Sequence, residues 1–341
     1  MNKSAQKSLG YALLFTLVVV LIQVMIGGTT RLTGSGLSIT KWDIVTGSLP
    51  PMSADSWQIE FEKYKATPQF VKLNYLMEID EFKFIYFWEW LHRFWGRWGF
   101  VLLFAIFLYY RFRHKMERKN VYRFLTLLFL YALQGALGWF MVKSGLIDNP
   151  YVSHYRLTAH LLLAIFLFAY ILWFAVQMLV PEERKISGTG LRRTAWWLTA
   201  LIVFQIMLGG FMSGLRAAVN YPTWPSMNGQ IIPDNLFARS PFFMNFLENI
   251  TTIQFMHRGT AYLLVILLLW YFFKARKRSL GSMFGKWLPT LPALLATQFL
   301  LGVLVLLNSK TGIPVAFGVA HQAVGLLLLS SMLFLNFQLK D

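Results

Sequence analysis

The chain alternates between long apolar runs and short polar segments. Seven runs are each about as long as a helix that crosses the hydrocarbon core of a membrane, namely residues 11–28, 121–142, 157–180, 195–212, 253–273, 287–307 and 313–336. An eighth run, at about 84–110, is long enough but contains Glu89, His92, Arg93 and Arg97. Such charges are costly unless they face the protein interior or the interface. The pattern predicts an all-α integral membrane protein with eight transmembrane helices.

Composition and charge support this prediction and set the expected topology. Hydrophobic residues make up 56% of the chain and charged residues only 14%, which leaves too little polar surface for a soluble domain. The net charge of +17 is concentrated in residues 111–123, 181–193 and 274–286, which carry six, four and five Lys/Arg, whereas 143–156 carries two. The positive-inside rule then places the basic loops and both termini in the cytoplasm. We expect a bacterial plasma membrane protein that does not bind nucleic acid.

The two halves of the chain repeat each other. Four stretches recur in the same order, at offsets of 182, 165, 164 and 161 residues: Gln23–Gly28 with Gln205–Gly210, Trp88–Arg93 with Ile253–Arg258, Gln134–Gly138 with Gln298–Gly302, and Thr158–His160 with Val319–His321. Each half holds four helices, so both halves have the same orientation. This predicts two parallel-repeat four-helix bundles, residues 1–185 and 186–341. The longest stretches expected to be non-helical, 29–83 and 213–250, also match and are expected to cover a site.

Four of the six histidines occupy repeated positions near the outer ends of helices. Two lie in each half on different helices, which suits bis-histidine ligation of a haem across a helical bundle. We pair His92 with His160 and His257 with His321. Zinc or copper is the alternative, but no third ligand is repeated with either pair. The other two histidines, His114 and His154, are expected to be solvated. Without cysteine the chain has no disulfide and no thiolate ligand.

The residues around the first histidine of each pair differ between the halves. Arg93 and Arg258 directly follow it and are candidate contacts for haem propionates, although an interfacial arginine is the alternative. Glu89 lies one helical turn before His92, whereas Gln254 takes that position before His257. A carboxylate in an apolar site is costly, which favours a catalytic role, unless it is a structural partner of an arginine. The first half is therefore expected to be the reaction site and the second an electron carrier.

Several longer motifs resemble the haem A synthase family. They are GGTTRLTGSGLSITKWDIVTGSLPP at 27–51, EFKFIYFWEWLHR at 81–93, GALGWFMVKSGL at 135–146, RLTAHL at 156–161, QFMHRGTAY at 254–262 and VAHQAVG at 319–325. Together they cover nearly the whole chain. The chain lacks the cysteine pairs that one branch of the family has in its outer loops, and its stretch 81–93 resembles the mitochondrial and proteobacterial branch. A redox role for loop cysteines therefore cannot operate here.

The resemblance implies an activity and a division of labour. The family oxidises the C8 methyl of haem O to a formyl by successive hydroxylations, giving haem A for terminal oxidases. His92 and His160 would then bracket the substrate haem, His257 and His321 would ligate a permanent haem B, and Glu89 would match the family's glutamate. The resemblance also implies as candidate partners the farnesyltransferase that makes haem O, oxidase assembly factors and further copies of the chain. It leaves the electron donor and acceptor open.

Two other functions fit parts of the pattern. A non-catalytic dihaem membrane cytochrome explains the four histidines and the repeat, but it does not explain why Glu89 has no counterpart. A transporter would need helices broken by Gly or Pro at the membrane midplane. The only such residues, Pro289 and Pro292, are expected near a helix start. The sequence therefore favours the synthase over both.

Overall fold

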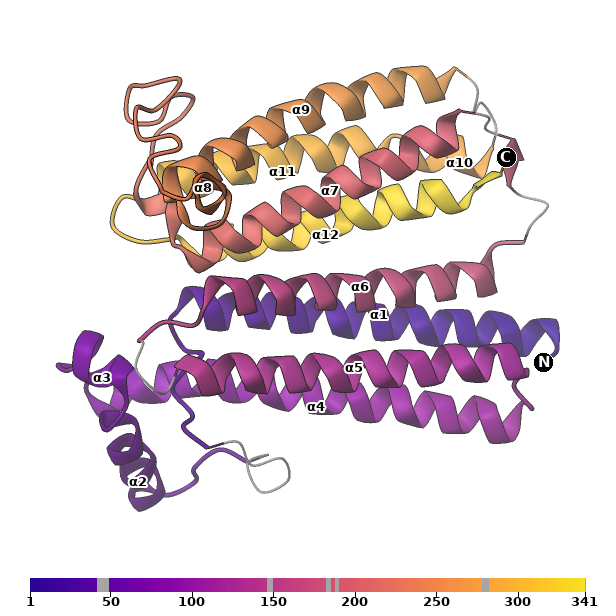
Figure 1. Ribbon diagram of the computed structural model, residues 1–341. Coiled ribbons are helices and arrows are strands. Elements are labelled where there is room, and N and C mark those ends of the chain that lie inside the picture. Colours follow the sequence, from indigo (N-terminus) through magenta and orange to yellow (C-terminus); the bar gives the residue numbers. More distant parts are fainter. Residues whose placement is uncertain (42–48, 146–149, 182–184, 188–189, 278–281, 341) are drawn as a thin grey trace. The chain divides into compact units, whose positions relative to one another are not determined.

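The computed structural model describes the chain except residues 42–48, 146–149, 182–184, 188–189, 278–281 and 341. Trp42, matched by Trp224 in the repeat, lies outside the described residues. The elements run in the order of Figure 1: α1 (Lys3–Leu32), α2 (Ala54–Lys65), α3 (Pro68–Leu73), α4 (Ile79–Arg113), α5 (Arg118–Gly145), α6 (His154–Leu179), β1 (Ile186–Ser187), α7 (Leu191–Gly214), η3 (Ala217–Val219), η4 (Phe242–Met244), α8 (Asn245–Glu248), α9 (Ile250–Arg276), α10 (Met283–Trp287), α11 (Thr290–Leu307), α12 (Val315–Phe337) and β2 (Leu339–Lys340).

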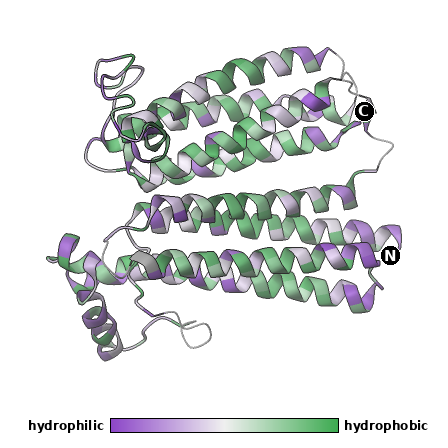
Figure 2. Ribbon diagram, viewed as in Figure 1, coloured by the Kyte–Doolittle hydropathy of each residue, from purple (hydrophilic) through white to green (hydrophobic). Residues whose placement is uncertain are grey.

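Eight helical segments in the described part of the chain are long and apolar enough to cross a membrane. They are α1, α4, α5, α6, α7, α9, α12 and the segment Met283–Leu307, which contains α10 and α11. In Figure 2 hydrophobic residues occupy the middles of these helices, and hydrophilic residues gather at many of their ends and in α2. The prediction of eight membrane helices is confirmed, and the chain is a multi-pass membrane protein.

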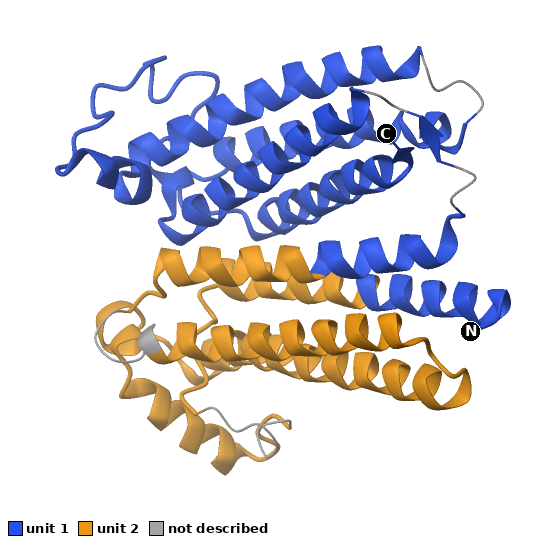
Figure 3. Cartoon of the chain, turned by 45° about the vertical axis from the view of Figure 1, so that its right-hand side comes forward, with its two compact units in different colours: residues 1–17, 168–341 blue, residues 18–167 orange. Residues whose placement is uncertain are grey.

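The chain forms two compact units, coloured separately in Figure 3. One contains residues 18–167, and the other contains residues 1–17 and 168–341. The division falls inside α1 and α6, so each of these helices contributes to both units. The expected halves at 1–185 and 186–341 remain a prediction.

The unit of residues 1–17 and 168–341 is built around four long helices. α7 packs against α9 and α12, and α11 packs against the same two helices, which closes a four-helix arrangement. A buried hydrogen bond from the Asn336 side chain to Thr199 Oγ1 (2.7 Å) joins α12 to α7. The two short strands pair in parallel, with Ile186 opposite Leu339. Contacts between long apolar helices therefore make up most of the packing in this unit.

In the unit of residues 18–167, α4 packs against α5 and is tied to α1 by hydrogen bonds, two of them on either side of His92. The indole nitrogen of Trp95 donates to the Val19 carbonyl (3.0 Å), and the hydroxyl of Thr30 donates to the Trp88 carbonyl (3.0 Å). Both bonds satisfy polar groups that would otherwise be unpaired in an apolar setting. They fix α1 alongside the part of α4 that carries Glu89 and His92.

The expectation that residues 29–83 are non-helical is wrong. α1 extends to Leu32, and the stretch contains α2 and α3 (Figure 1). A capping box between Ser53 and Ser56 begins α2, and Thr67 caps α3 ahead of a proline at its first turn. These helices are held by an aromatic cluster that they form with the start of α4, made of Phe61, Tyr64, Phe82, Ile85 and Tyr86. The cluster sits next to Glu89 in sequence and anchors the loop to the site.

The matching stretch 213–250 holds only short elements, namely η3, η4 and α8. It is organised by side-chain amides. The Asn245 side chain accepts a hydrogen bond from the main-chain N–H of Arg239 (2.8 Å) and donates one to its carbonyl (2.9 Å). The Asn249 side chain caps the start of α9. This loop therefore leads directly into the helix that carries His257.

Candidate functional site

The unit of residues 18–167 brings His92 of α4 and His160 of α6 together. The two rings lie close enough for a charge on one to act on the other. Each ring has a nitrogen against a glutamine amide from a neighbouring helix, at 3.1 Å for Gln23 with His92 and 3.1 Å for Gln134 with His160. Both amides also donate to the main-chain carbonyl of the same histidine, at 3.0 Å. The sequence singled out these histidines but not the contacts that hold them.

The other unit brings His257 of α9 and His321 of α12 together in the same way. These rings also lie within electrostatic reach of each other. Gln205 Nε2 donates to the His257 carbonyl at 2.9 Å and lies 3.5 Å from a ring nitrogen. Gln298 Nε2 lies 3.3 Å from His321 Nε2, and His321 Nδ1 lies 3.1 Å from the Gln298 carbonyl. Each unit therefore holds one of the two pairs proposed from the sequence, and the action of each pair as iron ligands remains a prediction.

Glu89 is buried, and both of its carboxylate oxygens are bonded. Arg93 donates to one oxygen at 2.5 Å, and the Ser38 hydroxyl and the Ile39 main-chain N–H both donate to the other at 2.8 Å. Arg93 further donates to the carbonyls of Ile39 and Lys41, at 3.1 and 3.0 Å. Three donors, one of them charged, therefore hold this carboxylate in place. Glu89 and Arg93 therefore clamp the segment after α1 onto α4, beside His92.

The equivalent position near His257 is neutral. Gln254 is fully buried and donates to the Tyr221 carbonyl at 3.1 Å. Arg258 donates to the carbonyls of Tyr221 and Ser226, at 2.8 and 3.1 Å. Both units therefore use the arginine after the histidine to hold the preceding loop by its main chain. They differ in that only the first carries a buried negative charge.

The unpartnered polar atoms of the described residues concentrate around the four histidines. Eight of the fourteen buried side-chain atoms without a hydrogen-bond partner belong to this set: one oxygen each of Gln23, Gln134, Gln205, Gln254 and Gln298, Nδ1 of His160 and His257, and Nε of Arg258. Buried polar groups are normally satisfied, so this concentration marks where a polar ligand belongs. A pair of imidazoles and a free guanidinium N–H fit the iron and the propionates of a haem.

Other candidate sites are less suited to chemistry. No cluster of three or more His, Cys, Asp or Glu that could hold a metal ion occurs among the described residues. His154 stacks on Tyr155, with ring centroids 4.0 Å apart, and His114 packs against Tyr109 and Tyr110. These contacts of His154 and His114 are with tyrosines and involve none of the four paired histidines.

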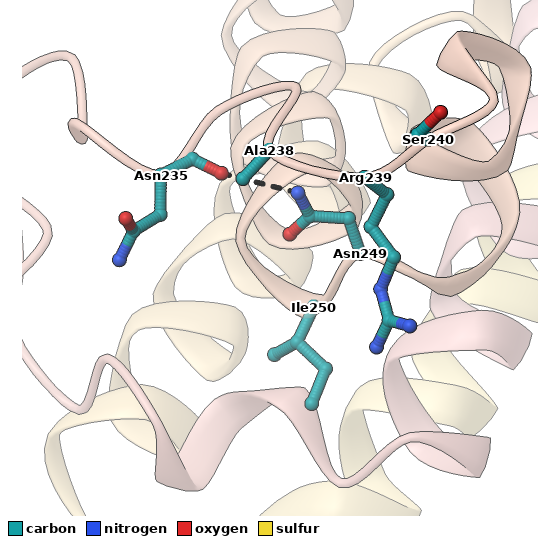
Figure 4. Close-up of a pocket in the computed structure, with 6 residues that line it drawn as sticks. All are labelled: Asn235, Ala238, Arg239, Ser240, Asn249 and Ile250. Atoms are coloured by element: carbon teal, nitrogen blue, oxygen red, sulfur yellow. Dashed lines mark hydrogen bonds between the residues drawn. The ribbon is translucent and has the colours of Figure 1, made fainter.

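A surface pocket lies where the loop meets the start of α9 (Figure 4). Its lining residues are Asn235, Ala238, Arg239, Ser240, Asn249 and Ile250. Asn249 crosses it to donate to the Asn235 carbonyl at 3.1 Å, which ties the loop to the helix start. No histidine and no carboxylate lines the pocket, so it lacks groups for acid–base or iron chemistry.

Comparison with known proteins identifies the family. The model of the cytochrome oxidase assembly protein family matches residues 10–333. The chain is 40% identical to a haem A synthase of Flavobacterium johnsoniae, over 97% of this chain and 98% of that protein. It is 44% identical to one of Parvibaculum lavamentivorans (89% and 86%) and 40% identical to one of Nitrosospira multiformis (99% and 95%). Since the match spans nearly the whole of each protein, the chain belongs to the cytochrome oxidase assembly protein family.

Proposed function

We propose that this protein is a haem A synthase, an oxidoreductase that converts haem O to haem A by oxidising the C8 methyl to a formyl through successive hydroxylations. Full-length similarity to relatives that bear this name supports the assignment. The observation that separates it from an electron carrier is the buried carboxylate of Glu89 beside His92, where the repeat has Gln254. An electron carrier with two equivalent haems would gain nothing from this asymmetry.

The two histidine pairs take different haems in this proposal. His92 and His160 would hold the substrate haem, and His257 and His321 would hold a resident haem B. A bound haem supplies an iron that can exchange single electrons. The neutral surroundings of His257, with Gln254 in place of a carboxylate, suit a group that only relays electrons.

Glu89 and Arg93 act on the substrate side. The Glu89 carboxylate accepts a proton or stabilises positive charge that develops near the substrate ring. Arg93 balances its charge, and Ser38 and Ile39 fix its orientation. Because three donors hold the carboxylate, it is positioned before the substrate binds.

Both arginines hold the preceding loop by its main chain. Arg258 uses both terminal nitrogens on loop carbonyls, and its buried Nε has no partner among the described residues. This N–H is the donor that we assign to a propionate of haem B. Arg93, which follows His92 as Arg258 follows His257, is assigned a contact with a propionate of the substrate haem.

From the positions of the basic loops we infer that both termini lie in the cytoplasm and the histidines toward the outer leaflet. The reaction then takes place near the outer face of a bacterial plasma membrane. The farnesyltransferase that makes haem O and oxidase assembly factors are the expected partners.

The alternative, a dihaem cytochrome without catalysis, is tested by the products. The full chain is produced in membranes that contain haem O and have no other haem A synthase, and extracted haems are identified by chromatography and mass. The wild type is expected to yield haem A. His92→Ala should retain haem B but lose haem A, and His257→Ala should lose haem B. Membranes that hold haem B and unaltered haem O, with oxygen and reductant present, would support the cytochrome.

A further inference from the structure

One local arrangement occurs four times in the chain. Each paired histidine contacts a glutamine on the membrane helix before its own, and a glycine four residues after that glutamine lies against the imidazole ring. The four sets are Gln23 and Gly27 with His92, Gln134 and Gly138 with His160, Gln205 and Gly209 with His257, and Gln298 and Gly302 with His321. The repeating unit is thus a helix pair, which is half of the four-helix repeat.

The glycines make room for the rings. A methyl group added at Gly27 would come within 2.8 Å of His92 Cε1, and one at Gly302 within 3.0 Å of His321 Cε1. Real side-chain carbons essentially never approach as closely as the distance at Gly27, and the distance at Gly302 is tighter than nine in ten real contacts, so glycine is needed most at Gly27. The glutamine and the glycine lie one turn apart on the same helix face. Together they form a slot that receives one imidazole.

A small residue completes the slot on the helix of the histidine itself. Four positions after the histidine stand Gly96, Ala164, Ala261 and Gly325. The amide nitrogens of Gln23 and Gln298 lie 3.3 Å from where a side-chain carbon at Gly96 and Gly325 would stand. The glutamine therefore reaches the histidine across a position that a larger residue would block.

We propose that Gln23, Gln134, Gln205 and Gln298 are positioning residues that orient the four imidazoles as iron ligands. This inference rests on the proposed haem function. Histidines that bind metals usually hold a fixed partner that sets the ring orientation and the tautomer. In His321 the Nδ1–H donates to the main-chain carbonyl of Gln298, and the side-chain amide of Gln298 stands 3.3 Å from Nε2, so this glutamine contacts both nitrogens of the ring. Since an amide carries no charge, it orients the ring without drawing the ligand toward imidazolate, as a carboxylate would.

The competing interpretation is that these amides only join helices. A structural amide would affect the stability of the fold but not the electronic state of an iron held by the histidines. The test therefore needs a spectroscopic reading of the iron, together with a measure of haem affinity.

The experiment uses the full chain, purified in detergent, as wild type, Gln205→Met and Gln298→Met. Methionine keeps the length of the side chain and removes the amide. The matched control is Gln338→Met, because Gln338 is also a buried amide that bonds one main-chain carbonyl, and it lies about 25 Å along α12 from His321. Size-exclusion chromatography checks folding. The readings are the low-spin iron signal in electron paramagnetic resonance, the midpoint potential, and the rate of haem loss to excess apo-globin.

We expect Gln205→Met and Gln298→Met to fold, to change the low-spin signal and to lose haem about 10- to 100-fold faster, while Gln338→Met matches the wild type. Variants that keep the wild-type signal, potential and rate of haem loss would overturn the inference and leave the haem function intact. An equal effect of Gln338→Met would also overturn it, because the amides would then act on stability alone. A wild type without a low-spin haem would contradict the proposed function itself, and the inference with it.

Discussion

The Glu89–Arg93 pair is almost fully buried, with side-chain exposures of 3% and 8%. An ion pair at such a depth is costly to bury, yet breaking it is costlier, because removing one partner leaves the other charge without compensation. The pair also carries hydrogen bonds to the segment after α1. Its residues therefore have a structural function in addition to the chemistry that we propose for Glu89.

Removal of Arg93 should expose this coupling. We expect Arg93→Met to lower the free energy of unfolding by about 3–5 kcal/mol, since it leaves a buried carboxylate without its cation. The double variant Glu89→Gln/Arg93→Met should cost less than the two single variants added together. Denaturation in detergent, followed by circular dichroism, measures each value. Additive costs would show that the two side chains do not depend on each other.

Sequence reasoning located the residues with distinctive chemistry but not their partners. The four histidines and Glu89 stood out because ionisable groups are rare in apolar helices. The bonds of Arg93 and Arg258 to loop carbonyls could not be foreseen, because a main-chain acceptor has no signature in the sequence. The glutamines were part of the matched stretches. Comparison of one half of the chain with the other did not reveal the shorter Gln-x3-Gly repeat, because that repeat occurs twice within each half.

Among the helices, Gly27 of α1 lies closer to the His92 ring than Gly209 of α7 lies to the His257 ring. A methyl group at Gly27 would lie 2.8 Å from the His92 ring, whereas one at Gly209 would lie 3.5 Å from the His257 ring, an ordinary contact. The same substitution should therefore have opposite effects at two repeat-related positions.

We expect Gly27→Ala to destabilise the protein by about 1–3 kcal/mol through overpacking. Gly209→Ala should be neutral or stabilising by up to about 1 kcal/mol, because alanine favours a helix. Thermal unfolding of the two variants, compared with the wild type in the same detergent, shows whether each substitution raises or lowers the stability. A loss of stability at Gly209 as large as that at Gly27 would contradict the difference in spacing.

α2 and α3 were missed because they lie outside the apolar runs on which helix prediction relied. They are short, and their stability comes from caps and from aromatic packing rather than from a long hydrophobic face. Tyr64 is the centre of this packing. Its buried hydroxyl donates to Gln69 at 3.1 Å and accepts from Asn74 at 2.7 Å.

Burial raises the pKa of Tyr64 to about 12. An unfolded tyrosine has a pKa of about 10, so the folded protein favours the neutral phenol more strongly than the unfolded chain does. The stability that depends on this phenol is fully present below pH 10 and is lost as the pH rises toward 12. Between pH 9 and pH 12, the free energy of unfolding should therefore fall more steeply in the wild type than in Tyr64→Phe. Equal slopes would refute the assignment.

In the whole molecule, a repeated local arrangement around the histidines carries the asymmetric function that we propose. The eight membrane helices followed directly from the hydrophobic pattern, because length and apolarity suffice to identify them. Both histidine pairs use the same slots of glutamine and glycine. The difference between them reduces largely to one side chain, a carboxylate at 89 and an amide at 254, and the proposed division between a substrate site and a cofactor site depends on it.

The most direct test of this division is the haem content of membranes that contain haem O and either the wild type or Glu89→Gln, read by chromatography and mass. The account predicts haem A in the wild type. In Glu89→Gln it predicts at least a hundredfold loss of haem A, typical of removing an acid–base group, with haem B retained. Undiminished haem A in the variant would contradict a catalytic Glu89, and a parallel loss of haem B would show that the residue serves the fold rather than the reaction.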